Sequence, residues 1–145
     1  MLTEADVADV AAAGAQFVVT PAVVDSIGAA ARRGLPVAAG ALTPTEAYTA
    51  TRMGAAAVKL FPASLGGPAY LKALRDPFPH LPFVAVGGVG LAELPGFLAA
   101  GAIAAGVGGR WSATRRPAAT WTPCASGPAP SWPRRRDPSL RKAST

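Results

Sequence analysis

The feature that most constrains the fold of this 145-residue chain is a repeated unit. In each unit an alanine-rich helical segment is followed by a glycine and then by a short apolar segment. The glycine recurs at Gly14, Gly34, Gly54 and Gly101. Helices of about ten residues between short strands imply crossover connections, which place successive strands parallel in one sheet. We therefore predict an α/β fold, although the pattern does not show whether the sheet closes into a barrel. The five expected strands lie at 16–19, 35–39, within 55–64, at 83–86 and at 102–107.

Composition changes abruptly near residue 110. Residues 1–110 hold seven Lys/Arg, seven Asp/Glu and fifteen of the sixteen glycines. Residues 111–145 hold seven Lys/Arg, one acid, all three tryptophans and six prolines, so the whole net charge of +6 lies there. A segment with no apolar period and many prolines and arginines is typical of disorder. We predict one folded domain over 1–110 and a disordered Pro/Arg-rich tail over 111–145.

The sequence argues against several classes of protein. It has no run of eighteen apolar residues and no basic-then-apolar leader, so we expect a cytoplasmic protein without a membrane span. Cys124 is the single cysteine and His80 the single histidine. These two residues cannot supply a disulfide framework or a transition-metal site, so we expect no metal.

The stretch A-A-A-V-K-L-F-P-A-S, at 55–64, reads as a buried strand with one charge, Lys59. Burial disfavours the ammonium form and lowers the lysine pKa, which yields an amine able to attack a carbonyl carbon. The alternative is a lysine on an edge strand whose ammonium reaches solvent. The stretch alone leaves both interpretations open.

Two glycine pairs, Gly87-Gly88 and Gly108-Gly109, each follow a predicted strand. Glycine at such a position lets the backbone approach a ligand closely and turn its N–H groups toward an anion. Two pairs on the last two strands favour phosphate binding, because parallel α/β barrels often hold phosphate after those strands. Each pair alone is equally compatible with a tight turn.

Three stretches, V-K-L-F-P-A-S, G-G-P-A-Y-L-K-A-L and F-V-A-V-G-G-V, occur in this order. They resemble the class I aldolases that cleave 2-keto-3-deoxy-6-phosphogluconate (KDPG), a family that includes the 4-hydroxy-2-oxoglutarate (KHG) and phosphogalactonate aldolases. The resemblance covers roughly residues 2–110. It implies a (β/α)8 TIM barrel of which this chain holds about strands 4–8, a homotrimer, a phosphorylated 2-keto acid as substrate, and no cofactor.

The same resemblance implies roles for individual residues. Lys59 would form the Schiff base, and Phe61 and Pro62 would shape the substrate pocket beside it. Thr20 and Pro21 would bind substrate at the same mouth. Cleavage would release pyruvate and glyceraldehyde 3-phosphate. The phosphate would be held by Gly87, Gly88, Gly108 and Gly109.

The chain also departs from the family pattern. Val86 stands where a threonine is common, Arg110 where a serine is usual, and Ala39 where a proline is frequent. The first three strands, which carry the proton-shuttling glutamate and a carboxylate-binding arginine, have no counterpart. Glu46 is a substitute acid, but it suits a helix cap better. We therefore expect the 145-residue chain to be poorly stable and weakly active or inactive.

The tail over 110–145 allows two further hypotheses. A reading-frame change near Gly109 would restore a serine and a closing helix, so the tail could be a frameshift product. Genomic reads that uphold the present frame, with codons unable to give a serine-leucine-valine run, would contradict this. The rival is nucleic-acid binding, because basic residues interleaved with tryptophans can contact phosphates and stack on bases. The irregular spacing of these residues argues against it.

Overall fold

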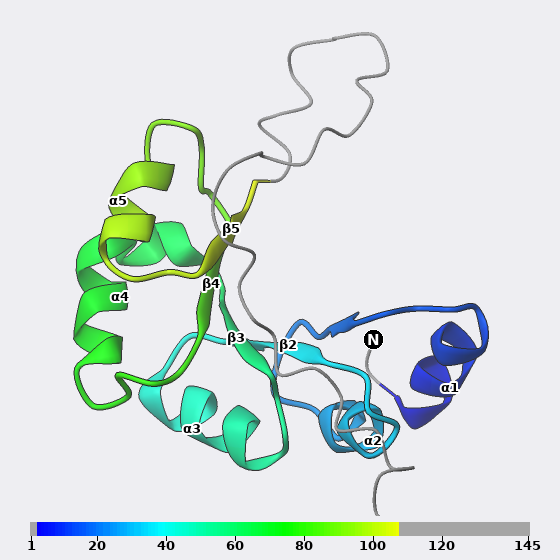
Figure 1. Cartoon of the computed structure of the whole chain (residues 1–145). Coiled ribbons are helices and arrows are strands. Elements are labelled where there is room, and N and C mark those ends of the chain that lie inside the picture. Colours follow the sequence, from blue (N-terminus) through cyan, green and yellow to red (C-terminus); the bar gives the residue numbers. More distant parts are fainter. Residues whose placement is uncertain (1–2, 108–145) are drawn as a thin grey trace, which may run out of the picture. The chain divides into compact units, whose positions relative to one another are not determined.

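The computed structural model describes residues 3–107, and within them five strands form one parallel sheet. The strands are hydrogen-bonded in chain order, β1 to β5, and a helix lies between each strand and the next. The sheet curls, with helices along its outer side (Figure 1). The predicted α/β fold, built as part of a TIM-type barrel, is confirmed. The strands are β1 (Val18–Val19), β2 (Val37–Ala41), β3 (Ala57–Leu60), β4 (Phe83–Val86) and β5 (Ala104–Gly106).

The helix starts follow the capping signals of the sequence. Helix α1 (Glu4–Ala12) begins with a capping box between Thr3 and Asp6. Helix α3 (Pro44–Arg52) begins with another between Thr43 and Glu46. Each box satisfies two backbone N–H groups that a helix start leaves unpaired. The remaining helices are α2 (Ser26–Arg32), the 3₁₀ turn η1 (Ala63–Leu65), α4 (Gly67–Arg75) and α5 (Leu94–Ala99).

The glycine of the repeat turns the chain from each helix into the next strand. Its φ angle is +88° at Gly14, +69° at Gly34, +97° at Gly54 and +94° at Gly101. These values lie in the left-handed region, which only glycine adopts at little cost after a helix C-terminus. The repeat thus has a backbone cause.

The two faces of the sheet have different surroundings. Alternate residues such as Val37, Val58 and Phe83 face the helices and are at most 1% exposed. The residues between them form the opposite, inner face, which includes Lys59 in register with Gly40 and Val84. That alternation is the expected period of two along a strand. The inner face is the one on which a barrel would carry its interior side chains.

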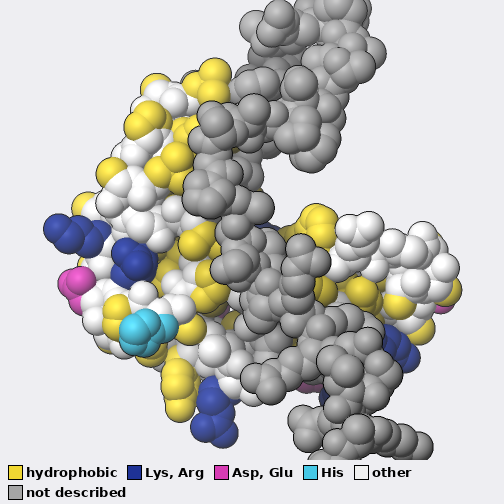
Figure 2. All heavy atoms as spheres, in the orientation of Figure 1, with side chains coloured by type: hydrophobic (Ala, Val, Ile, Leu, Met, Phe, Trp, Pro, Cys, Tyr) yellow, Lys and Arg dark blue, Asp and Glu magenta, His cyan; other side chains and the backbone are white. Residues whose placement is uncertain are grey.

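Several large apolar side chains remain exposed. Figure 2 shows hydrophobic side chains over α5 and the loop before it, where Leu91 is 64% and Leu98 46% exposed. Phe17 is 66% exposed, although we predicted it within the first strand. The strand is shorter than predicted because only Val18 and Val19 pair with β2.

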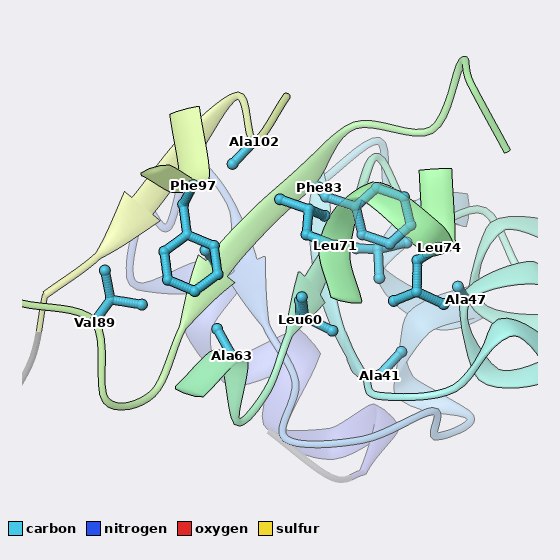
Figure 3. Close-up of a cluster of buried hydrophobic side chains, with 12 residues drawn as sticks. Ala41, Ala47, Leu60, Ala63, Leu71, Leu74, Phe83, Val89, Phe97 and Ala102 are labelled. Atoms are coloured by element: carbon cyan, nitrogen blue, oxygen red, sulfur yellow. The ribbon is translucent and has the colours of Figure 1, made fainter. Parts of the chain in front are cut away.

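Two clusters of buried side chains make up the core. The larger lies between β2–β5 and helices α3–α5, and Figure 3 shows Leu60 of β3 between Phe97 of α5 and Phe83 of β4. The smaller joins α1 and α2 to β1 and β2 and is centred on Ile27 and Val37. Helix α3 contributes to both, through Ala47 and Ala50. The core therefore lies on the helix-covered side of the sheet.

Some predictions lie outside residues 3–107. The disordered tail over 111–145, the boundary near 110 and the glycine pair Gly108-Gly109 belong to this group. Within the part that the structure describes, no helix is long and apolar enough to cross a membrane. The same part contains no group of three or more His, Cys, Asp or Glu side chains placed to hold a metal ion.

Candidate active site

Lys59 lies on β3, the middle strand of the five. Its backbone is in register with Gly40 on β2 and with Val84 on β4. The alternative of a lysine on an edge strand is therefore wrong. The side chain stands on the inner face and is partly buried.

The ammonium of Lys59 has an aromatic ring rather than a carboxylate beside it. Its Nζ lies 5.2 Å from the centroid of the Phe61 ring, and no ion pair to it is formed within residues 3–107. Burial lowers the pKa of Lys59 below the ordinary 10.5. A cation–π contact acts in the opposite sense because it favours the charged form. The net effect is an amine that is easier to deprotonate than an exposed lysine, as a nucleophile requires.

The turn after β1 passes over the inner face beside Lys59. A Cβ atom built on Gly40 would collide with the carbonyl group of Pro21 and would lie 2.9 Å from the amide nitrogen of Ala22. Gly40 is therefore the position where the absence of a side chain lets this turn pack against β2. The prediction that Thr20 and Pro21 lie at the same mouth as Lys59 agrees with this arrangement.

Thr20 is fully buried, and its hydroxyl is engaged by the backbone. It donates to the carbonyl oxygen of Ala22 at 2.8 Å and accepts a hydrogen bond from the Gly40 N–H at 3.4 Å. The bond from Gly40 fixes the turn to β2, and the bond to Ala22 lies within the turn. Gly40 was not among the predicted site residues, because no signal in the neighbouring sequence indicates a contact with a turn 20 residues away.

The two predicted pocket residues after Lys59 meet the first glycine pair. The Phe61–Pro62 peptide bond is cis. A Cβ on Gly87 would lie 2.7 Å from Cε2 of the Phe61 ring and 3.1 Å from Cα of Pro62. The loops after β3 and β4 are thus in direct contact. Phe61 touches both the Lys59 ammonium and Gly87, so it joins the amine to the glycine pair.

Ser64 extends this contact on the far side of the glycine pair. Its backbone N–H donates to the carbonyl oxygen of Gly87 at 3.0 Å. Its side chain lies against Gly88, where an added Cβ would be 2.6 Å from the Ser64 Cβ and would also clash with the hydroxyl oxygen. We assigned no role to Ser64 from the sequence, although it ends the V-K-L-F-P-A-S stretch.

Glu46 and His80, the other acid and base considered from the sequence, both lie in positions that fit a structural rather than a catalytic role. Glu46 Oε2 accepts hydrogen bonds from the backbone N–H groups of Leu42 and Thr43 at 2.9 and 2.8 Å, so its interpretation as a helix cap is confirmed. The Thr43 bond, followed by that from Leu42, lowers the pKa of Glu46. His80 is exposed, as expected of a solvated loop residue.

The fold and the position of Lys59 together indicate a class of protein. Parallel strands that pair in chain order, with helices on one face and a lysine on the other, are the architecture of an α/β barrel with a site at the strand ends. A model of the KDPG and KHG aldolase family matches residues 1–118. The chain belongs to the KDPG and KHG aldolase family.

Two relatives carry different substrate names. The chain is 42% identical over 97 residues to a 2-dehydro-3-deoxy-6-phosphogalactonate aldolase of Escherichia coli, a match that covers 66% of this chain and 47% of that protein. It is 43% identical over 101 residues to a 2-dehydro-3-deoxy-phosphogluconate aldolase of Pseudomonas aeruginosa, which covers 68% and 46%. The chain thus spans about half the length of these relatives.

Solved structures show the same fold. A structure described as native KDPGal superposes with a TM-score of 0.72 at 39% identity, covering 74% of this chain and 53% of that one. A KDPG aldolase from Legionella pneumophila, with pyruvate captured as a covalent carbinolamine, has a TM-score of 0.56 at 32% identity and covers 61% and 44%. Both similarities show that this chain has the fold of these aldolase structures over the matched residues.

Proposed function

We propose that this chain carries the amine-bearing part of a Schiff-base aldolase that cleaves a 2-keto-3-deoxy-6-phospho sugar acid, with KDPG as the first candidate. The position of Lys59 carries the proposal. It is a partly buried amine with lowered pKa in the middle of the inner face. A lysine of this kind is the nucleophile that imine chemistry needs.

The reaction proceeds through covalent steps at Lys59. The free amine attacks C2 of the keto acid, and loss of water leaves a protonated imine. The C3–C4 bond then breaks, its electron pair passes into the imine to form an enamine, and the C4 hydroxyl loses its proton as C4 becomes the aldehyde carbon of glyceraldehyde 3-phosphate. Protonation of the enamine at C3 and hydrolysis of the imine release pyruvate and restore the amine.

Cleavage also needs a proton acceptor for the C4 hydroxyl, and Glu46 is the acid that we considered for this role. Glu46 is held in the cap of α3 by Leu42 and Thr43. By resemblance, proton transfer belongs to a glutamate on one of the first three strands of the family's barrel. Because Glu46 is held in this cap, we expect it not to accept the C4 proton, and we expect the 145-residue chain to form the imine at Lys59 more readily than it cleaves the C3–C4 bond.

The loops around Lys59 support a phosphorylated substrate. The inner-face turn at Thr20 and Pro21, together with Phe61 and Pro62, would contact the keto acid, and the Gly87-Gly88 pair would receive the phosphate. Gly87 and Gly88 have φ of +92° and +73°, so the backbone there is open to a close ligand. We assign Gly108 and Gly109 to the same phosphate on the resemblance alone.

Two other substrates of the family are the alternatives to KDPG. The same chemistry on 4-hydroxy-2-oxoglutarate or on 2-keto-3-deoxy-6-phosphogalactonate is the alternative, since relatives of both phosphorylated types match almost equally well. By resemblance we also propose a homotrimer located in the cytoplasm. Comparison of cleavage rates for the two phosphorylated epimers and the unphosphorylated acid assigns the substrate.

Reductive trapping tests the proposed nucleophile. The purified chain is incubated with pyruvate and borohydride, and the modified lysine is located by peptide mass mapping. The chain has three lysines, Lys59, Lys72 and Lys142, so the assignment is unambiguous. We expect the adduct on Lys59. Equal labelling of all three lysines, or labelling that avoids Lys59, contradicts the proposal.

A further inference from the structure

Ser64 has no role in the function proposed above, although its side chain lies against the Gly87-Gly88 pair. It stands at the middle of η1, in the loop after the Lys59 strand, and is exposed. Its hydroxyl makes no hydrogen bond within residues 3–107. A serine in a loop commonly bonds to nearby backbone, so a free hydroxyl against a second loop is a donor available to a ligand.

The backbone beside this hydroxyl is also unpaired. The N–H groups of Gly88 and Val89 donate to no acceptor in the part of the chain that the structure describes. Gly88 is exposed, and the Ser64 side chain lies against it. An anion placed over Gly88 could therefore accept from the Gly88 N–H and from the Ser64 hydroxyl together. Charge-assisted bonds of this kind are stronger than neutral ones.

A backbone hydrogen bond sets the position of Ser64. The Ser64 N–H donates to the Gly87 carbonyl at 3.0 Å, so the loop after β3 is fastened to the loop after β4. The carbonyl oxygen of Gly87 is thereby turned toward the backbone of Ser64. This leaves the N–H side of the following residues, rather than a carbonyl oxygen, for an anionic group.

We propose that the Ser64 hydroxyl, together with the Gly88 N–H, binds the phosphate group of the substrate and makes this chain discriminate phosphorylated from unphosphorylated 2-keto acids. The inference rests on the proposed Schiff-base function of Lys59. From the sequence, we expected the glycine pairs alone to bind the phosphate. The present inference adds a residue of the loop after β3 to that site.

The test compares trapping at Lys59 with two reagents. Wild type and Ser64→Ala are titrated with pyruvate and with KDPG in the presence of borohydride, and the concentration for half-maximal adduct on Lys59 is measured for each. A hydrogen bond to a charged group predicts that Ser64→Ala raises this concentration about ten-fold or more for KDPG. For pyruvate, which has no phosphate, we expect no change.

Two further variants separate phosphate binding from loop structure. Ser64→Thr keeps the hydroxyl and should restore most of the KDPG trapping. Leu65→Ala alters the neighbouring residue of the same turn, which is 70% exposed, and should leave both reagents unaffected. Inorganic phosphate should inhibit trapping by KDPG more strongly in wild type than in Ser64→Ala.

The outcomes for the two proposals are distinct. If Lys59 is trapped by neither reagent, the proposed function fails. If Lys59 is trapped but Ser64→Ala changes KDPG and pyruvate alike, or neither, then Ser64 does not bind phosphate and only this inference is overturned.

Discussion

The carbonyl group of Pro21 lies against the α-carbon of Gly40, where any side chain would collide with it. Gly40 is the β2 neighbour of Lys59 in the sheet register. A turn from one strand is thus brought over the next strand, beside the proposed nucleophile. Thr20 maintains this contact because its hydroxyl accepts a hydrogen bond from the Gly40 N–H and donates one to the Ala22 carbonyl within the turn.

We expect Gly40→Ala to displace the Thr20–Ala22 turn, because the added methyl group meets backbone atoms that cannot rotate away. Overpacking of this kind costs about 1–3 kcal/mol. Protease cleavage should be faster than for wild type, since cleavage follows the population of opened chains. Gly28→Ala is the matched control: its Cβ would lie 3.3 Å from the flexible end of Arg32 and in ordinary contact, at 4.0 Å, with the Met53 carbonyl oxygen. Equal effects of the two substitutions would contradict the role of Gly40.

Replacement of Lys59 should abolish the pyruvate adduct. Lys59→Arg keeps the positive charge, but a guanidinium does not deprotonate at accessible pH and cannot form the imine. Trapping at this position should fall to background, as judged by peptide mass mapping. Lys72→Arg, at an exposed position of α4, should trap pyruvate at Lys59 like wild type.

The pH dependence of trapping should show the lowered pKa of Lys59. Only the free amine attacks, so the adduct rate rises with pH and levels off above the folded-state pKa. Because burial lowers that pKa, the midpoint should lie below 10.5. Nα-acetyl-lysine measured in parallel gives the ordinary value. A midpoint at or above that of the model compound would refute the effect of burial.

Alanine at Gly87 should be more harmful than alanine at another left-handed glycine. Gly14 has φ of +88° with open space around it, whereas Gly87 has φ of +92° with the Phe61 ring in contact. Both substitutions incur a backbone cost of about 1–2 kcal/mol. Only Gly87→Ala adds a collision and should also reduce trapping at Lys59. Similar behaviour of the two variants would show that the Phe61 contact is unimportant.

Glu46→Gln should destabilise the chain in a pH-dependent way without changing Lys59. The folded-state pKa of Glu46 lies below the ordinary 4.5, so its contribution is complete above pH 4.5 and is lost as pH falls through the folded pKa. Because the carboxylate is exposed, we expect a few tenths of a kcal/mol at neutral pH. Protease cleavage rates of wild type and variant should converge at low pH. Loss of trapping in Glu46→Gln would instead indicate a catalytic acid.

The 145-residue chain by itself should lack a sharp thermal transition. On and beside its inner face, Val19 is 41% and Phe61 46% exposed, and parallel sheets are normally covered on both faces. Calorimetry of the monomer is the measurement. A cooperative transition would show that residues 3–107 form a self-sufficient core.

Deletion of residues 111–145 distinguishes the two hypotheses about the tail. A frameshift product has no evolved role, so the shortened chain should trap pyruvate at Lys59 as efficiently as the full chain. Strong, salt-dependent binding of single-stranded DNA that disappears on deletion would instead support nucleic-acid binding.

The amino-acid sequence by itself determined the order of helices and strands, the helix starts at Thr3 and Thr43, and the candidate nucleophile Lys59. These features depend on local signals such as capping pairs, terminal glycines and apolar periodicity, which act within a few residues. Only the tertiary structure decided that Lys59 lies on the central strand, that Pro21 crosses Gly40, and that Ser64 meets Gly88. Those contacts join residues about 20 or more positions apart, and the period of a strand carries no information about which distant loop packs against it.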